Sequence, residues 1–196
     1  MEQICERWKN HCDLIFLFAN DSVLEYYPKF GFTKKQEYEY SMIVLGKQKV
    51  TMDKLHMKIE ENIELVKAHY KILSNYSALS MLDNEILHEF YYQGVFAEHV
   101  WYDQEANLIF CMEQEDNAVV VYDILGKSNL TLEEVSQRIA WNFNIVTELQ
   151  FRFTPVNTQE LAVNLHKEED TTLFVRGNME KIFDSNNLMF PENIHA

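Results

Sequence analysis

The chain has 196 residues, of which 47% are hydrophobic, and it carries a formal net charge of -14 at pH 7. The hydrophobic content is sufficient for a folded core and argues against intrinsic disorder. A negative charge of this size repels phosphate groups, so the composition argues against nucleic acids and anionic membranes as partners. The same charge favours cationic ligands such as amines.

The cysteines and the hydrophobic pattern indicate a compartment. Cys5, Cys12 and Cys111 are an odd number of thiols, and the sequence shows no signal peptide. We therefore expect reduced thiols in a cytoplasmic protein. No apolar run approaches the ~20 residues that cross a membrane.

The first eleven residues predict the end of a helix. Ile4, Trp8 and His11 recur at helical spacing, but no start signal precedes them. We therefore expect the chain to open in the middle of a domain.

The stretch after this helix predicts a strand, a short helix and a turn. Leu14–Phe18 is a short apolar run of β-forming residues. Ser22 and Glu25 match the capping box that opens a helix. Pro28 stops that helix after about one and a half turns, and Gly31 suits a left-handed helix end.

Lys35–Met42 alternates as a second strand. Between the two strands, Asn20 is followed seven residues later by Tyr27 and then by the turn Lys29-Phe30-Gly31-Phe32. This order resembles the C-terminal half of the GNAT superfamily, the acetyl-CoA-dependent N-acetyltransferases. The resemblance implies that Tyr27 is the general acid that protonates the leaving thiolate of coenzyme A, and that Asn20 and Ser22 lie close to the cofactor. A phenol with a pKa of about 10 suits that step.

The same residues also fit a purely structural role. Val23, Leu24, Tyr27 and Phe30 lie at helical spacing, and an aromatic stripe of this kind is more often core than active site. In the family, the pyrophosphate-binding loop Q/R-x-x-G-x-G/A and its strand precede the first helix, and neither occurs in this sequence. Both interpretations of Tyr27 stay open.

Residues 46–196 predict a second unit. The expected strands are Val50–Lys58, His99–Tyr102, Asn107–Glu113, Ala118–Leu125, Ile145–Thr154, Leu161–His166 and Thr172–Arg176. The expected helices are Glu60–Leu73, Asn84–Ala97 and Thr131–Trp141, the last opened by a capping box of Thr131 and Glu134.

Several details of this unit are testable. In the second helix, Ile86, Phe90 and Phe96 are expected core positions, and Gly94 indicates an irregularity. Ala118–Leu125 is the most apolar strand and should be central. The last two strands are expected to form a hairpin around an acidic turn, and the tail after Ile182 is expected to dock.

The second unit resembles a degenerate GNAT-like domain. In the family, glycines keep backbone N–H groups bare for pyrophosphate; the corresponding stretch, Gly126–Thr131, has one glycine. No Tyr-bearing helix follows Thr154. The strands Leu14–Phe18 and Leu149–Phe153 share Leu-x-Phe-x-Phe, which fits either a duplication or chance.

A metal site is not expected. Glu85, His88 and Glu89 share a helix face, as metal ligands would, but a di-metal bundle needs this pattern twice and it occurs once. A solvated helix face is the better interpretation.

The sequence therefore predicts an α+β protein with a mixed sheet and a GNAT-like acyl-CoA N-acyltransferase fold. Residues 1–45, the first unit, would be the C-terminal half of one GNAT domain, and residues 46–196, the second unit, a degenerate GNAT-like domain. The expected function is transfer of an acetyl group from acetyl-CoA to a small-molecule or peptide amine, incomplete in this chain. The alternative is a non-catalytic binding or dimerisation module.

One surface is expected from the resemblance. The family places a strand beside Leu14–Phe18, and that strand is absent from this sequence. An open apolar edge templates pairing. We therefore expect either self-association through this edge or its coverage by the second unit.

Overall fold

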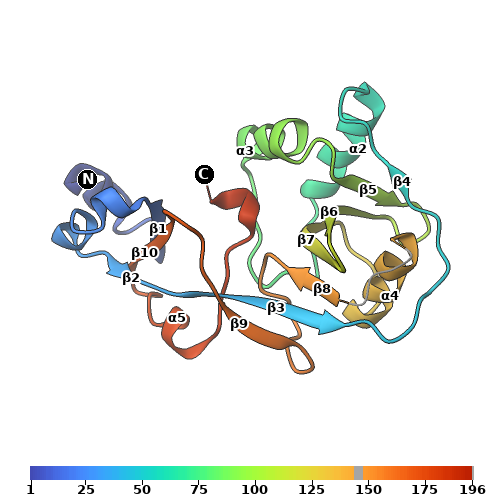
Figure 1. Cartoon of the computed structure of the whole chain (residues 1–196). Coiled ribbons are helices and arrows are strands. Elements are labelled where there is room, and N and C mark those ends of the chain that lie inside the picture. Colours follow the sequence, from blue (N-terminus) through green and yellow to red (C-terminus); the bar gives the residue numbers. More distant parts are fainter. Residues whose placement is uncertain (144–147, 196) are drawn as a thin grey trace.

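The computed structural model describes residues 1–143 and 148–195, and its elements are arranged around two β-sheets (Figure 1). The strands are β1 Leu14–Ala19, β2 Thr33–Lys34, β3 Glu37–Ile43, β4 Asp53–Lys54, β5 Val100–Asp103, β6 Leu108–Glu115, β7 Ala118–Leu125, β8 Glu148–Phe151, β9 Ala162–His166 and β10 Thr172–Gly177. The α-helices are α1 Glu2–Trp8, α2 Glu60–Tyr70, α3 Glu85–Phe90, α4 Leu132–Asn142 and α5 Ile182–Ser185. Short turns of other helix types are η1 Asp21–Val23, η2 Tyr27–Phe30, η3 Tyr91–Val95 and η4 Glu192–Ile194.

The large sheet has seven strands in the order β4-β5-β6-β7-β8-β3-β9. Neighbouring strands are antiparallel except β7 and β8, which run parallel from Ala118↔Glu148 to Val121↔Phe151. The expected strand Ala118–Leu125 is confirmed with the same bounds, and it is the central strand of the seven.

The composition of β7 explains its central place. Val119, Val120 and Val121 are fully buried, so the strand has an apolar partner on each face. On one face Val119 and Val121 pack in a cluster that includes Val135 and Ile139 of α4. On the other face Val120 packs in a cluster that includes side chains of α2 and η3. Burying a valine completely is worth about 1.5–3 kcal/mol, so a continuous apolar run is most stable with helices on both faces.

The small sheet has three strands in the order β1-β10-β2. β1 pairs antiparallel with β10 along its whole length, from Leu14↔Gly177 to Ala19↔Thr172. The expected strand Leu14–Phe18 is therefore confirmed, and one of its edges is covered by the second unit. On the other edge, no strand pairs with β1 among the described residues.

The two sheets exchange strands. β3 belongs to the first unit but lies between β8 and β9 of the second unit, whereas β10 belongs to the second unit but lies between β1 and β2 of the first. Strand pairing thus links residues on both sides of the expected boundary after residue 45. The division into two GNAT domains remains a prediction.

The expected strand Lys35–Met42 is present as β3, Glu37–Ile43, and the chain passes from the small sheet to the large one just before it, at Lys35 and Gln36. The exchange of strands corrects one expectation. The strands β9 and β10 are not a hairpin, since β9 pairs with β3 and β10 pairs with β1 and β2. Alternation of polar and apolar residues fits either sheet, so the sequence pattern does not choose between partners.

The helices of the second unit lie where they are expected, with one error of orientation. Phe96 is buried, but Ile86 is 84% exposed and Phe90 is 58% exposed, so these two are not core residues. The expected irregularity near Gly94 is the π-turn η3. The first residues of the expected strand Ile145–Thr154 lie outside the described residues, and the rest contains β8.

The tail docks, as expected. Phe183, Leu188 and Phe190 are buried in a cluster with Leu173 and Val175 of β10.

No helix among the described residues is both long and apolar enough to cross a membrane.

Candidate functional site

The turn after β1 holds two of the three expected site residues. Asn20 precedes η1 in an extended conformation, and the Ser22 hydroxyl donates a hydrogen bond of 2.5 Å to Oδ1 of Asn20. The expected capping box of Ser22 and Glu25 is therefore absent, because the chain forms short 3-10 turns in place of an α-helix. Both Asn20 and Ser22 are exposed.

The charge at this turn is negative. The Asp21 N–H donates to the carboxylate of Asp170 at 2.6 Å, so at least one backbone donor of the turn is already occupied. The side chains of Asp21 and Glu25 add further carboxylates on exposed positions. An incoming phosphate would have to displace Asp170 and bind beside like charges.

Tyr27, the third expected site residue, opens η2 and is half-buried. Its ring lies 6.1 Å from that of Phe32 and 5.6 Å from that of Phe174 on β10, within an apolar cluster that also includes Cys5. No hydrogen bond of its hydroxyl is found within the described part of the chain. The structure brings Asn20 and Ser22 into contact, and places Tyr27 on the following turn.

The expected end of this segment is confirmed. Gly31 has a φ of +77°, in the left-handed region, and its N–H donates to the carbonyls of Pro28 and Tyr27. The turn lets the chain reverse into β2 directly after Phe32, which is buried.

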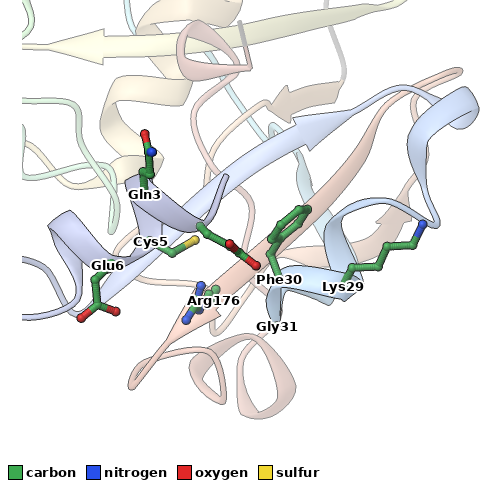
Figure 2. A pocket seen from close by; sticks show the side chains of 8 residues that line it. Gln3, Cys5, Glu6, Lys29, Phe30, Gly31 and Arg176 are labelled. Atoms are coloured by element: carbon green, nitrogen blue, oxygen red, sulfur yellow. The ribbon is translucent and has the colours of Figure 1, made fainter.

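An open pocket lies between α1, this turn and β10 (Figure 2). Its volume is about 660 Å³, and its lining includes Glu2 and Glu6 of α1, Lys29, Gly31 and Arg176. Arg176 comes from the second unit by way of the exchanged strand β10. The pocket holds two cationic and two anionic side chains, so its lining alone does not select the charge of a ligand.

In the second unit, several backbone groups of the loop Gly126–Thr131 already form hydrogen bonds with protein groups. Asn75 accepts from the Ser128 N–H at 3.3 Å and donates to the Ser128 carbonyl at 2.8 Å. The Leu130 N–H donates to the Ser128 hydroxyl at 3.3 Å. Thr131 and Glu134 form the expected capping box, which occupies the Thr131 and Glu134 N–H groups.

Gly126 lies close to neighbouring protein atoms and does not provide space for a ligand at this loop. Its φ is +95°, and a Cβ at this position would lie 3.0 Å from the Asn107 carbonyl oxygen and 3.1 Å from the His69 ring. The glycine is therefore needed for packing against β6 and α2.

The space where β7 and β8 diverge is filled by the tail. The ladder ends with the Arg152 N–H donating to the Val121 carbonyl at 2.9 Å. Beyond this point the Glu192 N–H donates to the Arg152 carbonyl at 3.2 Å, and the Asn193 amide donates to Asp123 at 3.0 Å. The turn η4 thus joins the ends of both parallel strands.

Asp123 is the buried acceptor at this junction. Its Oδ2 accepts hydrogen bonds from Tyr92 at 2.8 Å and from Asn193 at 3.0 Å, and its Oδ1 accepts from the Ile124 N–H at 2.8 Å. Burial raises the pKa of Asp123 to about 6 despite these donors.

A second cluster of side chains, which no sequence motif indicated, connects the tail to β3. His195 is stacked on Phe18 with ring centroids 4.0 Å apart, and its Nε2 lies 3.7 Å from Glu37. Its Nδ1 lies 3.5 Å from Glu168. Burial raises the pKa of Glu37, and the carboxylates of Glu168 and Glu37 outweigh burial and raise the pKa of His195. Glu168 and His195 lie 131 and 158 positions from Glu37 in the sequence, so no local motif identifies them.

The residues considered for a metal site bind protein groups. Glu85 pairs with Lys71 at 3.0 Å and Glu89 with Lys67 at 3.0 Å. His88 is buried, with its ring stacked on Tyr70 at 4.2 Å. No cluster of metal-ligating side chains is found in residues 1–143 and 148–195.

Comparison with solved structures identifies the fold. A protein of unknown function from Enterococcus faecalis V583, described as a probable N-acyltransferase, superposes with a TM-score of 0.51 and 10% identity, over 93% of this chain and 50% of that one. The chain has a GNAT-like fold. A GCN5-related N-acetyltransferase from Kribbella flavida matches over 90% of this chain and 46% of its own, with 15% identity and a TM-score of 0.46.

Two further facts qualify these similarities. The chain spans about half the length of these two solved structures. No protein-family model matches the sequence, and no curated protein matches it either.

Proposed function

We propose that this chain is part of a GNAT-type N-acetyltransferase that moves an acetyl group from acetyl-CoA to an amine, with Tyr27 as the general acid. The observation that carries the proposal is the order of elements in the first unit. A strand, β1, ends at Asn20, Tyr27 follows on a short helical turn, and Gly31 closes that turn in the left-handed conformation before β2. This is the order that the family resemblance of the sequence requires, and it lies in a GNAT-like fold.

The proposed chemistry assigns one step to this chain. Acetyl-CoA supplies the activated acetyl group, and the amine nitrogen attacks its thioester carbonyl. As the carbon–sulfur bond breaks, the Tyr27 hydroxyl gives its proton to the departing thiolate. The attacking nitrogen, which is positively charged after addition, releases a proton to solvent as the amide forms, and the phenolate of Tyr27 regains one. The hydroxyl of Tyr27 has no hydrogen bond within the described part of the chain, so it is available as a donor.

The remaining parts of the site are proposed to lie outside these 196 residues. Positioning of the cofactor and stabilisation of the oxyanion need backbone donors on a strand and glycine loop. In the family these precede the helix that corresponds to α1. The second unit offers no substitute, because its loop at Ser128 is bonded to Asn75 and the split between β7 and β8 holds the tail.

The test is a pair of tyrosine variants in a longer polypeptide that includes the preceding strand and loop. Tyr27→Phe should lower kcat by about 10²–10⁴-fold, the usual contribution of general acid catalysis, and leave the Kd for coenzyme A nearly unchanged. Tyr26→Phe is the matched control, since Tyr26 is the neighbouring residue and is 44% exposed. Equal kcat values for Tyr27→Phe and the unsubstituted protein would overturn the assignment.

A non-catalytic binding or dimerisation module is the second candidate. It is favoured by the ring of Tyr27 packing in an apolar cluster and by the carboxylates of Asp21 and Asp170 at the expected cofactor turn. The acetyl-transfer assay of the longer polypeptide separates the two candidates, because a non-catalytic module shows no acetyl transfer in it. For either candidate we propose a cytoplasmic location, based on the free thiols of Cys5, Cys12 and Cys111.

A further inference from the structure

One of the two edges of the large sheet is formed by β9, the last strand in the order, which pairs with β3 (Figure 1). Its residues Ala162, Val163, Asn164 and Leu165 are all exposed, and no described strand pairs with its outer side. We propose that this edge pairs with the same edge of a second copy of the chain, antiparallel about a two-fold axis at Asn164. The proposal is independent of the acetyltransferase activity.

The hydrogen bonds of β3 show which groups of β9 are free. The Tyr38 N–H donates to the Leu188 carbonyl at 3.1 Å, and β9 occupies the opposite side of β3. Glu39, the next residue, therefore directs its N–H and C=O toward its partner Asn164. It follows that Val163 and Leu165 direct their backbone N–H and C=O groups away from β3, to the open edge.

The side chains on this edge match a second copy in antiparallel pairing. About a two-fold axis at Asn164, Val163 of one copy lies opposite Leu165 of the other, and the pair exchanges two backbone hydrogen bonds on each side of the axis. Val163 is 42% exposed and Leu165 is 40% exposed. Both lie on the face of Tyr40, which is buried in the core that α4 covers. Pairing would therefore continue this apolar face from one copy into the next.

The edge lacks the features that usually prevent such pairing. Natural edge strands carry lysine, proline or a bulge. Ala162–His166 contains no lysine and no proline, and its register with β3 runs without a shift from Ser41↔Ala162 to Glu37↔His166. None of the five residues carries a carboxylate, although the chain has a net charge of -14. Because the chain as a whole is acidic, two copies repel each other least where their facing surfaces carry no carboxylate, and this strand is such a surface.

Pairing at the strand ends is compatible with this register. Lys167 of one copy lies opposite Leu161 of the other and next to Glu160, so a cation lies beside a carboxylate at each end. Glu168 lies opposite Glu160 in the same register, just outside the paired strands, and this repulsion limits the seam to residues 162–166.

The first test measures association directly. Sedimentation equilibrium across a wide range of protein concentration should show a species of twice the 23.3 kDa chain mass. Val163→Lys and Leu165→Lys should each raise the dimer Kd by about tenfold or more, because each dimer then holds two charges on its seam. Ile86→Lys on α3 is the matched control, since Ile86 is 84% exposed and distant from this edge, and its Kd should not change. A monomer at all concentrations, or a dimer indifferent to both edge lysines, would overturn the proposal.

The second test does not depend on the stability of the lysine variants. Cys12 is the exposed native thiol, so Cys12→Ser provides the background. In it, Asn164→Cys should give a disulfide-linked dimer on mild oxidation, because residue 164 faces itself across a non-hydrogen-bonded pair. Ala162→Cys is the control: it lies opposite His166 of the second copy, so two such cysteines are out of disulfide reach. Equal cross-linking of the two variants would contradict the register, and absence of cross-linking at Asn164→Cys would contradict the interface.

Discussion

The buried carboxyl of Asp123 gives the first prediction, because it joins the tail to the point where β7 and β8 part. Its Oδ2 accepts from Tyr92 and Asn193, and it lies in a site where burial raises its pKa to about 6 from an ordinary value of 3.8. A group whose pKa is higher in the folded state stabilises that state at low pH, and this contribution is lost as pH rises through the folded pKa. Asp123 should therefore make the protein less stable at neutral pH than near pH 5.

The magnitude follows from the linkage relation. With a folded pKa of about 6 and an unfolded pKa of 3.8, Asp123 adds about 1 kcal/mol to the free energy of unfolding at about pH 5.3 and almost nothing at about pH 7.5. The lower pH is chosen to stay above the sequence pI of 4.9, where the protein has least net charge. In Asp123→Asn the side chain is neutral at both pH values, so this difference should vanish.

The assay is urea unfolding of both proteins at the two pH values. Contributions from Glu37, Glu168 and His195 are common to both and cancel in the comparison. Asp53→Asn, at an exposed position of β4, is the control and should show the pH dependence of the unsubstituted protein. If Asp123→Asn loses as much stability between the two pH values as the unsubstituted protein, Asp123 does not titrate in this range and the reasoning is wrong.

Three further substitutions test the packing that positions the site, each by the urea midpoint. Arg138→Met should cost about 3–5 kcal/mol, because Asp103 is fully buried and would lose the charge that pairs with it at 2.6 and 2.9 Å; a neutral result would show that Asp103 has another partner. Gly177→Ala should cost more than about 2 kcal/mol, since φ is +142° and the new Cβ would lie 2.3 Å from the Asp13 carbonyl oxygen; a loss below about 1 kcal/mol would contradict the tight pairing of β1 with β10. Thr131→Ala should cost about 1 kcal/mol through loss of the capping box of α4, and an unchanged midpoint would show that this box adds nothing.

Local signals predicted the elements well where the sequence itself fixes the backbone. The run at Ala118–Leu125 has the same bounds in sequence and structure, because its successive valines suit a strand covered on both faces. Gly31 adopts the left-handed conformation that its place after a short helix predicts. The capping box at Thr131 forms, whereas the same motif at Ser22 does not, because Pro28 leaves too few residues for an α-helix and 3-10 turns replace it.

Pairing between distant segments could not be predicted in the same way. The exchange of β3 and β10 between sheets depends on which partner edge is free, and alternation in the sequence is identical for either partner. The contact of His195 with Glu37 links positions far apart in the chain and has no motif. Of the three expected site residues, the pattern correctly placed Asn20 at the end of a strand and Tyr27 on a helical turn. It did not reveal that the ring of Tyr27 packs against Phe174 of the exchanged strand.

Calorimetric titration of acetyl-CoA into the 196-residue chain tests the central claim most directly. The claim is that the first unit holds the general acid Tyr27 without the positioning loop, and that the second unit is closed by its own Ser128 loop and tail. We expect weak binding or none, and no measurable acetyl transfer from the same solution to an amine. A low-micromolar Kd for coenzyme A would contradict the account, because it would require a complete cofactor site within these residues.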